Sequence, residues 1–262
     1  MNWRRALVCL VVLAPLSAAA QERQHLTVFA AASLREAFRE LGDTMERRTP
    51  GLRVDFNFAG SQELAAQLLA GAAADVFASA DGRWMKFARD SGIIAGEPRA
   101  FVRNRLVVIV PKTTSGGIGK LQDLARPGVK LVLASSVVPA GAYSRVMLNN
   151  LSRSPGFDAD FGSRTINNVV SQEQDVRAVV SKVQLGEADA GVCYVSDVSP
   201  KVSRDVRVFE IPEAANVVAE YPIARVKNGA NAAGALAFID LVISPAGQAT
   251  LARHHFAPLD AH

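Results

Sequence analysis

"VFAAASLREAFREL", residues 28–41, changes from a strand pattern to a helix pattern at Ser33. The run before Ser33 is apolar, as in a strand, and Leu34 and Phe38 after it recur at helical spacing. Ser33 and Glu36 match a capping box, in which the serine accepts a hydrogen bond from a backbone N–H of the first turn and the glutamate reaches back. A helix N-terminus that follows a strand is also a place where proteins bind anions. The pattern leaves both roles open for Ser33, and a helix cap is the commoner of the two.

The first twenty residues have the pattern of a secretory signal peptide. Arg4 and Arg5 precede an apolar run, and the small residues at 18–20 supply an A-x-A cleavage site. The apolar run is too short to span a bilayer. We therefore expect the mature chain to begin near Gln21 and to be soluble in the periplasm.

Composition and charge argue against several classes of protein. Cleavage would remove two arginines, so the net charge would fall from +4 to +2. Because there is no long run of Lys or Arg and aromatic residues are only 6%, a nucleic-acid-binding surface is not indicated. Cys193 would be the single cysteine of the mature chain, so no internal disulfide is expected. An apolar fraction of 49% is enough to form the core of one or two lobes.

Strand patterns alternate with helix patterns along the rest of the chain. The continuous apolar run "RLVVIVP", residues 105–111, is typical of a strand buried on both faces. The alternation predicts an α/β fold with mostly parallel sheets. Strands are expected at 26–31, 53–58, 75–79, 105–111, 130–135, 190–195, 206–211 and 217–226, and helices starting near 34, 62, 82, 140, 176, 231 and 246.

Motifs for catalysis and for metal binding are missing from the sequence. The glycine-rich stretch 113–120 lacks the first glycine of a phosphate-binding loop and the Ser or Thr that should follow its lysine. The histidines have no H-E-x-x-H spacing, and no G-x-S-x-G nucleophile motif occurs. Asp75 and Asp81 stand where carboxylates usually serve as strand-end or helix-cap residues. We expect no catalytic residues and no cofactor.

A small or polar residue opens several of the helices that follow strands. Ser33 and Ser61 do so in the first half of the chain, and the turns around Ala140 and Val176 do so in the second. In open α/β sheets, ligands bind beyond the carboxyl ends of the strands, where such turns lie. The repetition favours a shared anion site over a set of unrelated helix caps.

Seven motifs, in this order, resemble the periplasmic molybdate-binding proteins of ABC transporters, a group of type II periplasmic binding proteins. The resemblance covers about Leu26 to Pro258. It implies two α/β lobes joined by two crossing strands, with an oxyanion in the cleft between them. The motifs are "VFAAASL", "FAGSQELAAQL", "ADVFASAD", "NRLVVIVPK", "VPAGAYS", "DVRAVVSKVQLGEADAGVCYVSD" and "SPAGQATLARHHF".

The implied domain organisation follows from the two crossing strands, "RLVVIVP" and "EYPIARV". The signal would occupy residues 1–20, the first lobe 22–108 plus 222–262, and the second lobe 109–221. The resemblance also implies a monomer that delivers its ligand to a membrane permease.

Carried over by position, the resemblance implies five contacts to molybdate or tungstate: the hydroxyls of Ser33, Ser61 and Tyr194 and the backbone N–H groups of Ala140 and Val176. The metal would be contacted only as its oxyanion. Molybdate is a fully deprotonated dianion whose oxygens only accept hydrogen bonds, and hydroxyls and helix-start N–H groups can all donate. The sequence departs from many relatives at Ser135 and Ser136, where an Asp-Pro-like step is usual, and this bears on the shape of the pocket.

Two alternatives stay open. One is a receptor of the same fold for sulfate, thiosulfate or another oxyanion. The other, more distant, is a secreted enzyme that uses the cleft, with Asp75, Asp81 or Glu173 as acid or base.

Overall fold

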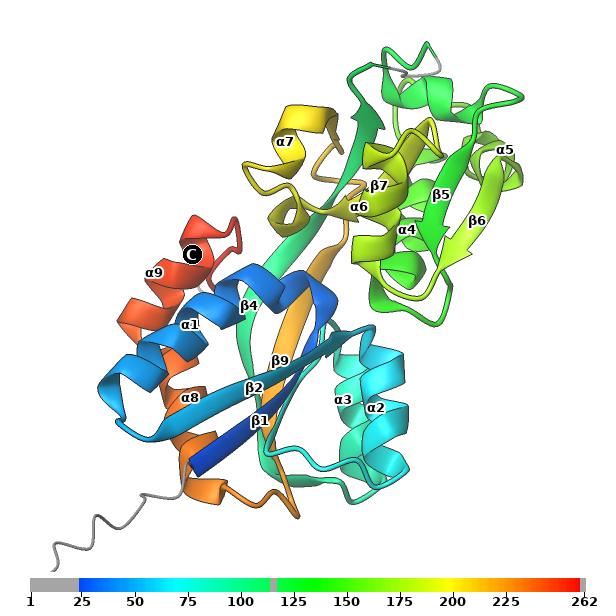
Figure 1. The fold of residues 1–262 in the computed structure, drawn as a ribbon. Helices are drawn as coiled ribbons and strands as arrows, with labels where there is room; N and C mark the ends of the chain where they lie inside the picture. The colour runs from blue at the N-terminus through cyan, green and yellow to red at the C-terminus, as the bar shows by residue number, and fades with distance from the viewer. Residues whose placement is uncertain (1–23, 114–116, 260–262) are drawn as a thin grey trace, which may run out of the picture.

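The computed structural model describes residues 24–113 and 117–259 (Figure 1). The predicted signal segment and its cleavage point lie outside these ranges. Two long strands, β4 (Ile94–Pro111) and β9 (Val218–Val226), run side by side through the middle of the molecule and connect its two halves.

The half built around the N-terminal strands is the first lobe. Its strands follow the order β2-β1-β3-β9-β4, in which β1 pairs in parallel with β2 and β3, and β9 is antiparallel to both β3 and β4. Its remaining elements are β1 (Gln24–Ala31), the 3-10 helix η1 (Ala32–Leu34), α1 (Arg35–Arg48), β2 (Leu52–Ala59), α2 (Ser61–Leu69), β3 (Val76–Ala78), α3 (Gly82–Asp90), α8 (Ala232–Ile243) and α9 (Pro245–Arg253).

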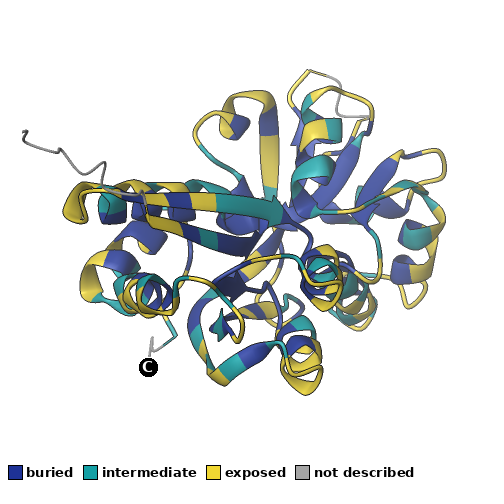
Figure 2. Cartoon of the chain, turned by 60° about the horizontal axis from the view of Figure 1, so that its bottom comes forward, coloured by how far each residue is buried: buried dark blue, intermediate teal, exposed yellow. Residues whose placement is uncertain are grey.

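Helices cover both faces of the first sheet (Figure 1). α1, α8 and α9 pack together on one face, and α2 and α3 pack on the other. Successive side chains of β1 point to opposite faces, so Val28 joins the core with Phe38 and Phe29 joins a separate core with Leu64 and Met85. Figure 2 shows the resulting pattern of buried strands with helices exposed on their outer sides.

The second lobe contains a smaller sheet in the order β4-β7-β5-β6, and β8 also pairs with β4. β5 is parallel to β6 and β7, whereas β7 and β8 are antiparallel to β4. The elements are η2 (Leu121–Ala125), β5 (Leu131–Ala134), α4 (Pro139–Leu151), α5 (Phe161–Asn167), β6 (Val169–Glu173), α6 (Val176–Gln184), β7 (Ala190–Tyr194), η3 (Val195–Asp197), α7 (Val202–Asp205) and β8 (Val206–Glu210).

The structure corrects three details of the expected fold. The expectation of mostly parallel sheets is wrong, because β4 and β9 are antiparallel to all their neighbours. β4 begins at Ile94 rather than near Arg105, since its first half pairs with β9 through irregular steps that apolar patterning does not reveal. α5 and β6 were not expected from the sequence.

Within the described ranges, no single helix is long and apolar enough to cross a membrane. α8 and α9 are long and apolar enough only when taken together, and they are bent by 65° at their junction.

The first turn of α4 lies directly against the end of β5. A Cβ added at Gly141 would lie 2.0 Å from the carbonyl oxygen of Ser135 and 2.2 Å from that of Ala134. These are backbone atoms, so no side chain can rotate to make room. Only glycine permits this approach, which sets the position of the neighbouring residue Ala140.

Gly141→Ala should therefore displace the start of α4 and lower the free energy of unfolding by about 1–3 kcal/mol, the usual cost of overpacking. Gly82→Ala is the matched control, because Gly82 also lies in a first helical turn but has no atom within 4 Å of the added Cβ. That variant should be neutral or slightly more stable. Urea unfolding of both proteins checks the prediction, and equal stabilities would contradict it.

Candidate functional site

One pocket lies where the first turns of helices from the two lobes meet. All five residues expected from the sequence line it: Ser33 in η1, Ser61 at the start of α2, Ala140 in α4, Val176 at the start of α6, and Tyr194 at the end of β7. Most of the other lining residues are small, which lets the backbone approach the pocket closely: Ala31, Ala32, Ala59, Gly60, Ala80, Val138, Pro139 and Asp175.

The predicted capping box at Ser33 is wrong. Helix α1 begins at Arg35 without a side-chain cap. The buried Ser33 hydroxyl instead forms a 2.9 Å hydrogen bond with the hydroxyl of Tyr221, on β9. The Glu36 carboxylate pairs with Arg177, at 2.8 Å between Oε1 and Nη2. Both partners are distant in the sequence, so a local pattern could not reveal them.

The other two hydroxyls of the pocket differ in their partners. Ser61 Oγ accepts a hydrogen bond from the backbone N–H of Ala80 at 3.0 Å, which leaves its own proton for the pocket. Tyr194 is 1% exposed, and its hydroxyl has no hydrogen-bond partner among the described residues. Burial raises the pKa of Tyr194 well above its usual value, so the hydroxyl keeps its proton. A buried hydroxyl without a partner costs about 1–3 kcal/mol, which a ligand that accepts this proton would offset.

Ala140 and Val176 offer the backbone donors of helix N-termini. Val176 is the first residue of α6, and Ala140 follows Pro139, the first residue of α4. The first N–H groups of a helix lack partners within the helix, and the helix dipole makes this end positive. Asp175 caps α6 by accepting from the N–H groups of Arg177 and Ala178, at 2.8 and 3.0 Å, so the Val176 N–H is not used by the cap.

Polar side-chain contacts join the lobes around the pocket. The Glu36–Arg177 pair links α1 to α6, and the side-chain amide of Gln62 donates to the Gln174 carbonyl at 2.8 Å. On the other side, the indole N–H of Trp84 donates to the Val137 carbonyl at 2.9 Å. The structure is therefore the closed arrangement of the cleft.

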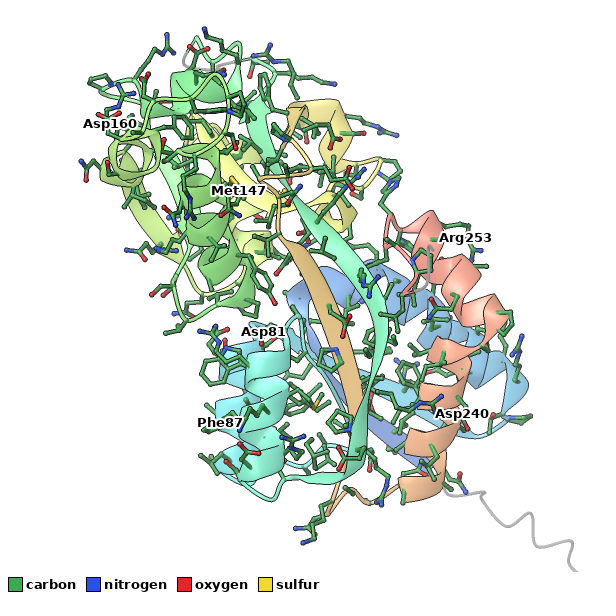
Figure 3. The ribbon with its side chains drawn as sticks, turned by 180° about the vertical axis from the view of Figure 1, so that it is seen from behind. Asp81, Phe87, Met147, Asp160, Asp240 and Arg253 are labelled. Carbon is green, nitrogen blue, oxygen red and sulfur yellow. The ribbon has the colours of Figure 1, made fainter. Side chains whose placement is uncertain are left out.

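The carboxylates considered for an enzyme have other positions, and none lines the pocket. Asp75 accepts from two backbone N–H groups, of Thr27 and Asn231, each at 2.7 Å. Asp81, labelled in Figure 3 at the end of α3 that faces the second lobe, caps α3 by accepting from Trp84 N–H. Glu173 pairs with Lys182 at 2.8 Å.

Two residues at the site were not expected from the sequence: Asp175, which lines the pocket, and Tyr221, which contacts Ser33. Asp175 could have been recognised, because an aspartate directly before a helical run of valines is an N-cap signal. Tyr221 carried no local signal, since only the pairing of β9 brings it to Ser33. Ser135 and Ser136, expected from the resemblance to bear on the shape of the pocket, do not line it. No group of three or more His, Cys, Asp or Glu that could hold a metal ion occurs in the described part of the chain.

The comparisons with known proteins agree with this architecture. The family model for bacterial extracellular solute-binding proteins matches residues 26–257, and the chain belongs to this family. The expected two-lobed α/β fold of type II periplasmic binding proteins is thereby confirmed. The molybdate-binding protein ModA of Mycobacterium tuberculosis H37Rv is 39% identical over 237 residues, which cover 90% of this chain and 86% of that protein.

Two solved structures show the same fold at lower sequence identity. The periplasmic molybdate-binding protein of Azotobacter vinelandii superimposes with a TM-score of 0.77 at 19% identity, covering 90% of this chain and 100% of that one. The sulfate-binding protein SubI of M. tuberculosis gives 0.78 at 16% identity, covering 91% and 88%. The fold is thus common to receptors of different oxyanions, and the ligand has to be argued from the site.

A buried carboxylate beside the pocket makes the stability of the protein depend on pH. Asp197 is 0% exposed; its Oδ2 accepts from the Tyr194 N–H at 3.0 Å, and its Oδ1 has no partner among the described residues. Burial raises the pKa of Asp197 from 3.8 to about 7, against the opposing attraction of Arg177. Between these values the folded protein holds a proton that the unfolded chain has released.

The free energy of unfolding should therefore fall as the pH rises from about 4 to about 7. Asp197→Asn keeps the acceptor for Tyr194 N–H and should flatten this dependence. Asp240→Asn, which removes an exposed carboxylate on α8, controls for the loss of one charge. Urea unfolding across this pH range is the measurement; the same slope in the wild type and in Asp197→Asn would refute the assignment.

Proposed function

We propose that this protein binds molybdate, and also tungstate, in the cleft between its lobes and delivers the oxyanion to the membrane permease of an ABC transporter. The observation that carries the proposal is the excess of hydrogen-bond donors in the pocket. The hydroxyls of Ser33, Ser61 and Tyr194 line the pocket, Tyr194 has no partner among the described residues, Ser61 accepts from the Ala80 N–H, and Ala140 and Val176 lie in the first turns of helices. The family and the 39% identity to a molybdate-binding relative support the same ligand.

A pocket of donors suits a fully deprotonated oxyanion. Molybdate and tungstate carry two negative charges and no proton at neutral pH, so every oxygen accepts hydrogen bonds. Hydrogen bonds to a charged group are about twice as strong as those between neutral groups, so neutral donors can hold the dianion without a basic side chain. Hydrogen phosphate brings a proton, and against the hydroxyl and N–H donors this proton creates a donor–donor clash that should exclude it.

Sulfate is the second candidate, because it is also a dianion without protons and a sulfate-binding protein has the same fold. It differs from molybdate mainly in its smaller size. Direct comparison of the two ions separates the candidates. An enzymatic use of the cleft has less support, because Asp75, Asp81 and Glu173 are held in structural contacts away from the pocket.

The same proposal includes the organisation and location of the chain. We propose that the lobes comprise residues 22–108 plus 222–262 and residues 109–221, which fits the passage of β4 from pairing with β9 to pairing with β7 after Arg105. We further propose export to the periplasm with loss of about the first twenty residues, and function as a monomer with the permease as partner.

Molybdate and tungstate should stabilise the protein strongly, whereas sulfate and phosphate should not. A ligand at one hundred times its dissociation constant adds about 2.7 kcal/mol, which for a chain of this size raises the melting temperature by roughly 5–10 °C. Thermal shift screening of the four ions measures this directly.

Intrinsic fluorescence gives an independent readout of the same titration. Trp84 is the one tryptophan outside the predicted signal, and it donates a hydrogen bond across the cleft. Its emission should change only with the ions that close the cleft. Equal melting shifts with sulfate would favour the sulfate receptor, and no shift with any of the ions would overturn the proposed function.

Tyr194→Phe should weaken molybdate binding without weakening the ligand-free protein. Loss of one hydrogen bond to a charged ligand costs about 1.5–3 kcal/mol, or roughly ten- to a hundredfold in affinity. The ligand-free protein loses only a hydroxyl that has no partner, so its stability should be unchanged or higher. Ser61→Ala should lose similar affinity but also stability, because the buried Ala80 N–H loses its acceptor. Calorimetric titration and melting curves of each variant test both statements.

Tyr143→Phe is the matched control for this series. Tyr143 lies on α4 but does not line the pocket. Its affinity for molybdate should equal that of the wild type. If Tyr194→Phe also binds normally, the Tyr194 hydroxyl is not a ligand contact.

A further inference from the structure

A chain of buried hydrogen bonds leads from the two crossing strands to the Ser33 hydroxyl. Asn104, on β4, donates from Nδ2 to the hydroxyl of Tyr221, on β9, at 3.3 Å. The Tyr221 hydroxyl is 2.9 Å from Ser33 Oγ. All three side chains are at most 4% exposed, so water does not compete for these groups. Asn104 also donates to Ser196 Oγ at 2.8 Å, which ties the chain to the second lobe.

The direction of the hydrogen bonds is set at Asn104. Its Oδ1 accepts from the backbone N–H of Arg105 at 3.0 Å, and a backbone N–H can only donate. The amide oxygen of Asn104 must therefore face Arg105, and the amide nitrogen faces Tyr221. Because an amide nitrogen cannot accept, Tyr221 is the acceptor in its hydrogen bond with Asn104.

The Tyr221 hydroxyl then has a single hydrogen-bond acceptor among the described residues. Burial raises the pKa of Tyr221, so the hydroxyl stays neutral and keeps its proton. Ser33 Oγ is the one further atom that forms a hydrogen bond with it. Tyr221 donates to Ser33, so the Ser33 proton must point away from Tyr221, and Ser33 lines the pocket.

We propose that Tyr221, oriented by Asn104, is a positioning residue for ligand specificity: it occupies the acceptor side of Ser33 and turns the Ser33 proton into the pocket. The inference rests on the proposed function, since it concerns how the same pocket distinguishes its ligands. With Tyr221 in place, Ser33 offers the ligand a donor. Without it, the Ser33 hydroxyl can rotate and accept a proton from a ligand such as hydrogen phosphate. Tyr221 thus excludes protonated oxyanions without touching them.

The test compares Tyr221→Phe with the wild type by calorimetric titration with molybdate and with phosphate. The affinity for molybdate should fall about three- to tenfold, the range for one neutral hydrogen bond, because the Ser33 proton is no longer oriented. Discrimination against phosphate should decrease further at the lower pH values at which phosphate carries more protons. A merely structural role for Tyr221 would leave this ratio and its pH dependence unchanged. Tyr143→Phe serves as the control and should behave as the wild type in both titrations.

A double-mutant cycle separates action through Ser33 from general damage. In a Ser33→Ala background, Tyr221→Phe should cause no further loss of molybdate affinity, because the hydroxyl that it orients is absent. If Tyr221→Phe does not fold, Asn104→Ala tests the same chain from its other end, because Tyr221 is then free to accept from Ser33. Its effect should likewise vanish in the Ser33→Ala background.

Failure of this inference and failure of the proposed function give different results. The positioning role alone would be overturned in two cases, both with a wild type that binds molybdate. In the first, Tyr221→Phe binds molybdate as tightly as the wild type. In the second, the losses of affinity in Tyr221→Phe and Ser33→Ala are additive. Wild type that binds neither molybdate nor tungstate would overturn the proposed function, and the inference with it.

Discussion

The antiparallel pairing of β4 with β9 is the constraint on which the rest of the structure depends. The two strands pair from Ile94 to Arg105 of β4, and β4 then continues into the second sheet, where it pairs with β7 and β8. β4 therefore belongs to both sheets, and β9 lies beside its first half. The cleft between the lobes lies beside this crossing. In each sheet the carboxyl ends of the parallel strands face the cleft, so residues from both lobes line the pocket. β4 carries Asn104 and β9 carries Tyr221, so the connection between the lobes also holds a serine that lines the pocket.

The pocket brings together hydrogen-bond donors from both lobes. Ser33 and Ser61 come from the first lobe, while Ala140, Val176 and Tyr194 come from the second. Gathering buried donors without an acceptor is unfavourable, and a tetrahedral dianion supplies acceptors in all directions. A ligand that contacts both lobes binds the closed arrangement better than an open one, so binding and closure are coupled. The cross-lobe contacts of Arg177 and Trp84 then stabilise the arrangement that the ligand selects.

Carboxylates around the site have mainly structural partners. Asp81 and Asp175 cap helices, Asp75 binds two backbone N–H groups, and Asp197 accepts from Tyr194 N–H. Each of these carboxylates accepts from at least one backbone N–H of the protein, and Asp175 is the one of them that also lines the pocket. Asp197 is buried without a cationic partner in contact among the described residues, and burial raises its pKa.

Local patterns in the sequence predicted most of the secondary structure because the relevant signals are short-range. A helix was expected to start near Gly82, and α3 does start there, since the capping aspartate and the helical spacing lie within one segment. The order of motifs predicted the family, and the five residues carried over from it do meet in one pocket, although their contacts with a ligand stay a prediction. Only the tertiary structure decided the partners of Ser33 and Glu36 in the stretch 28–41. Ser33 meets Tyr221 across 188 positions, and Glu36 meets Arg177 across 141. The local capping box was lost because these distant partners, brought together by the crossing strands and the closed cleft, compete for the same two side chains.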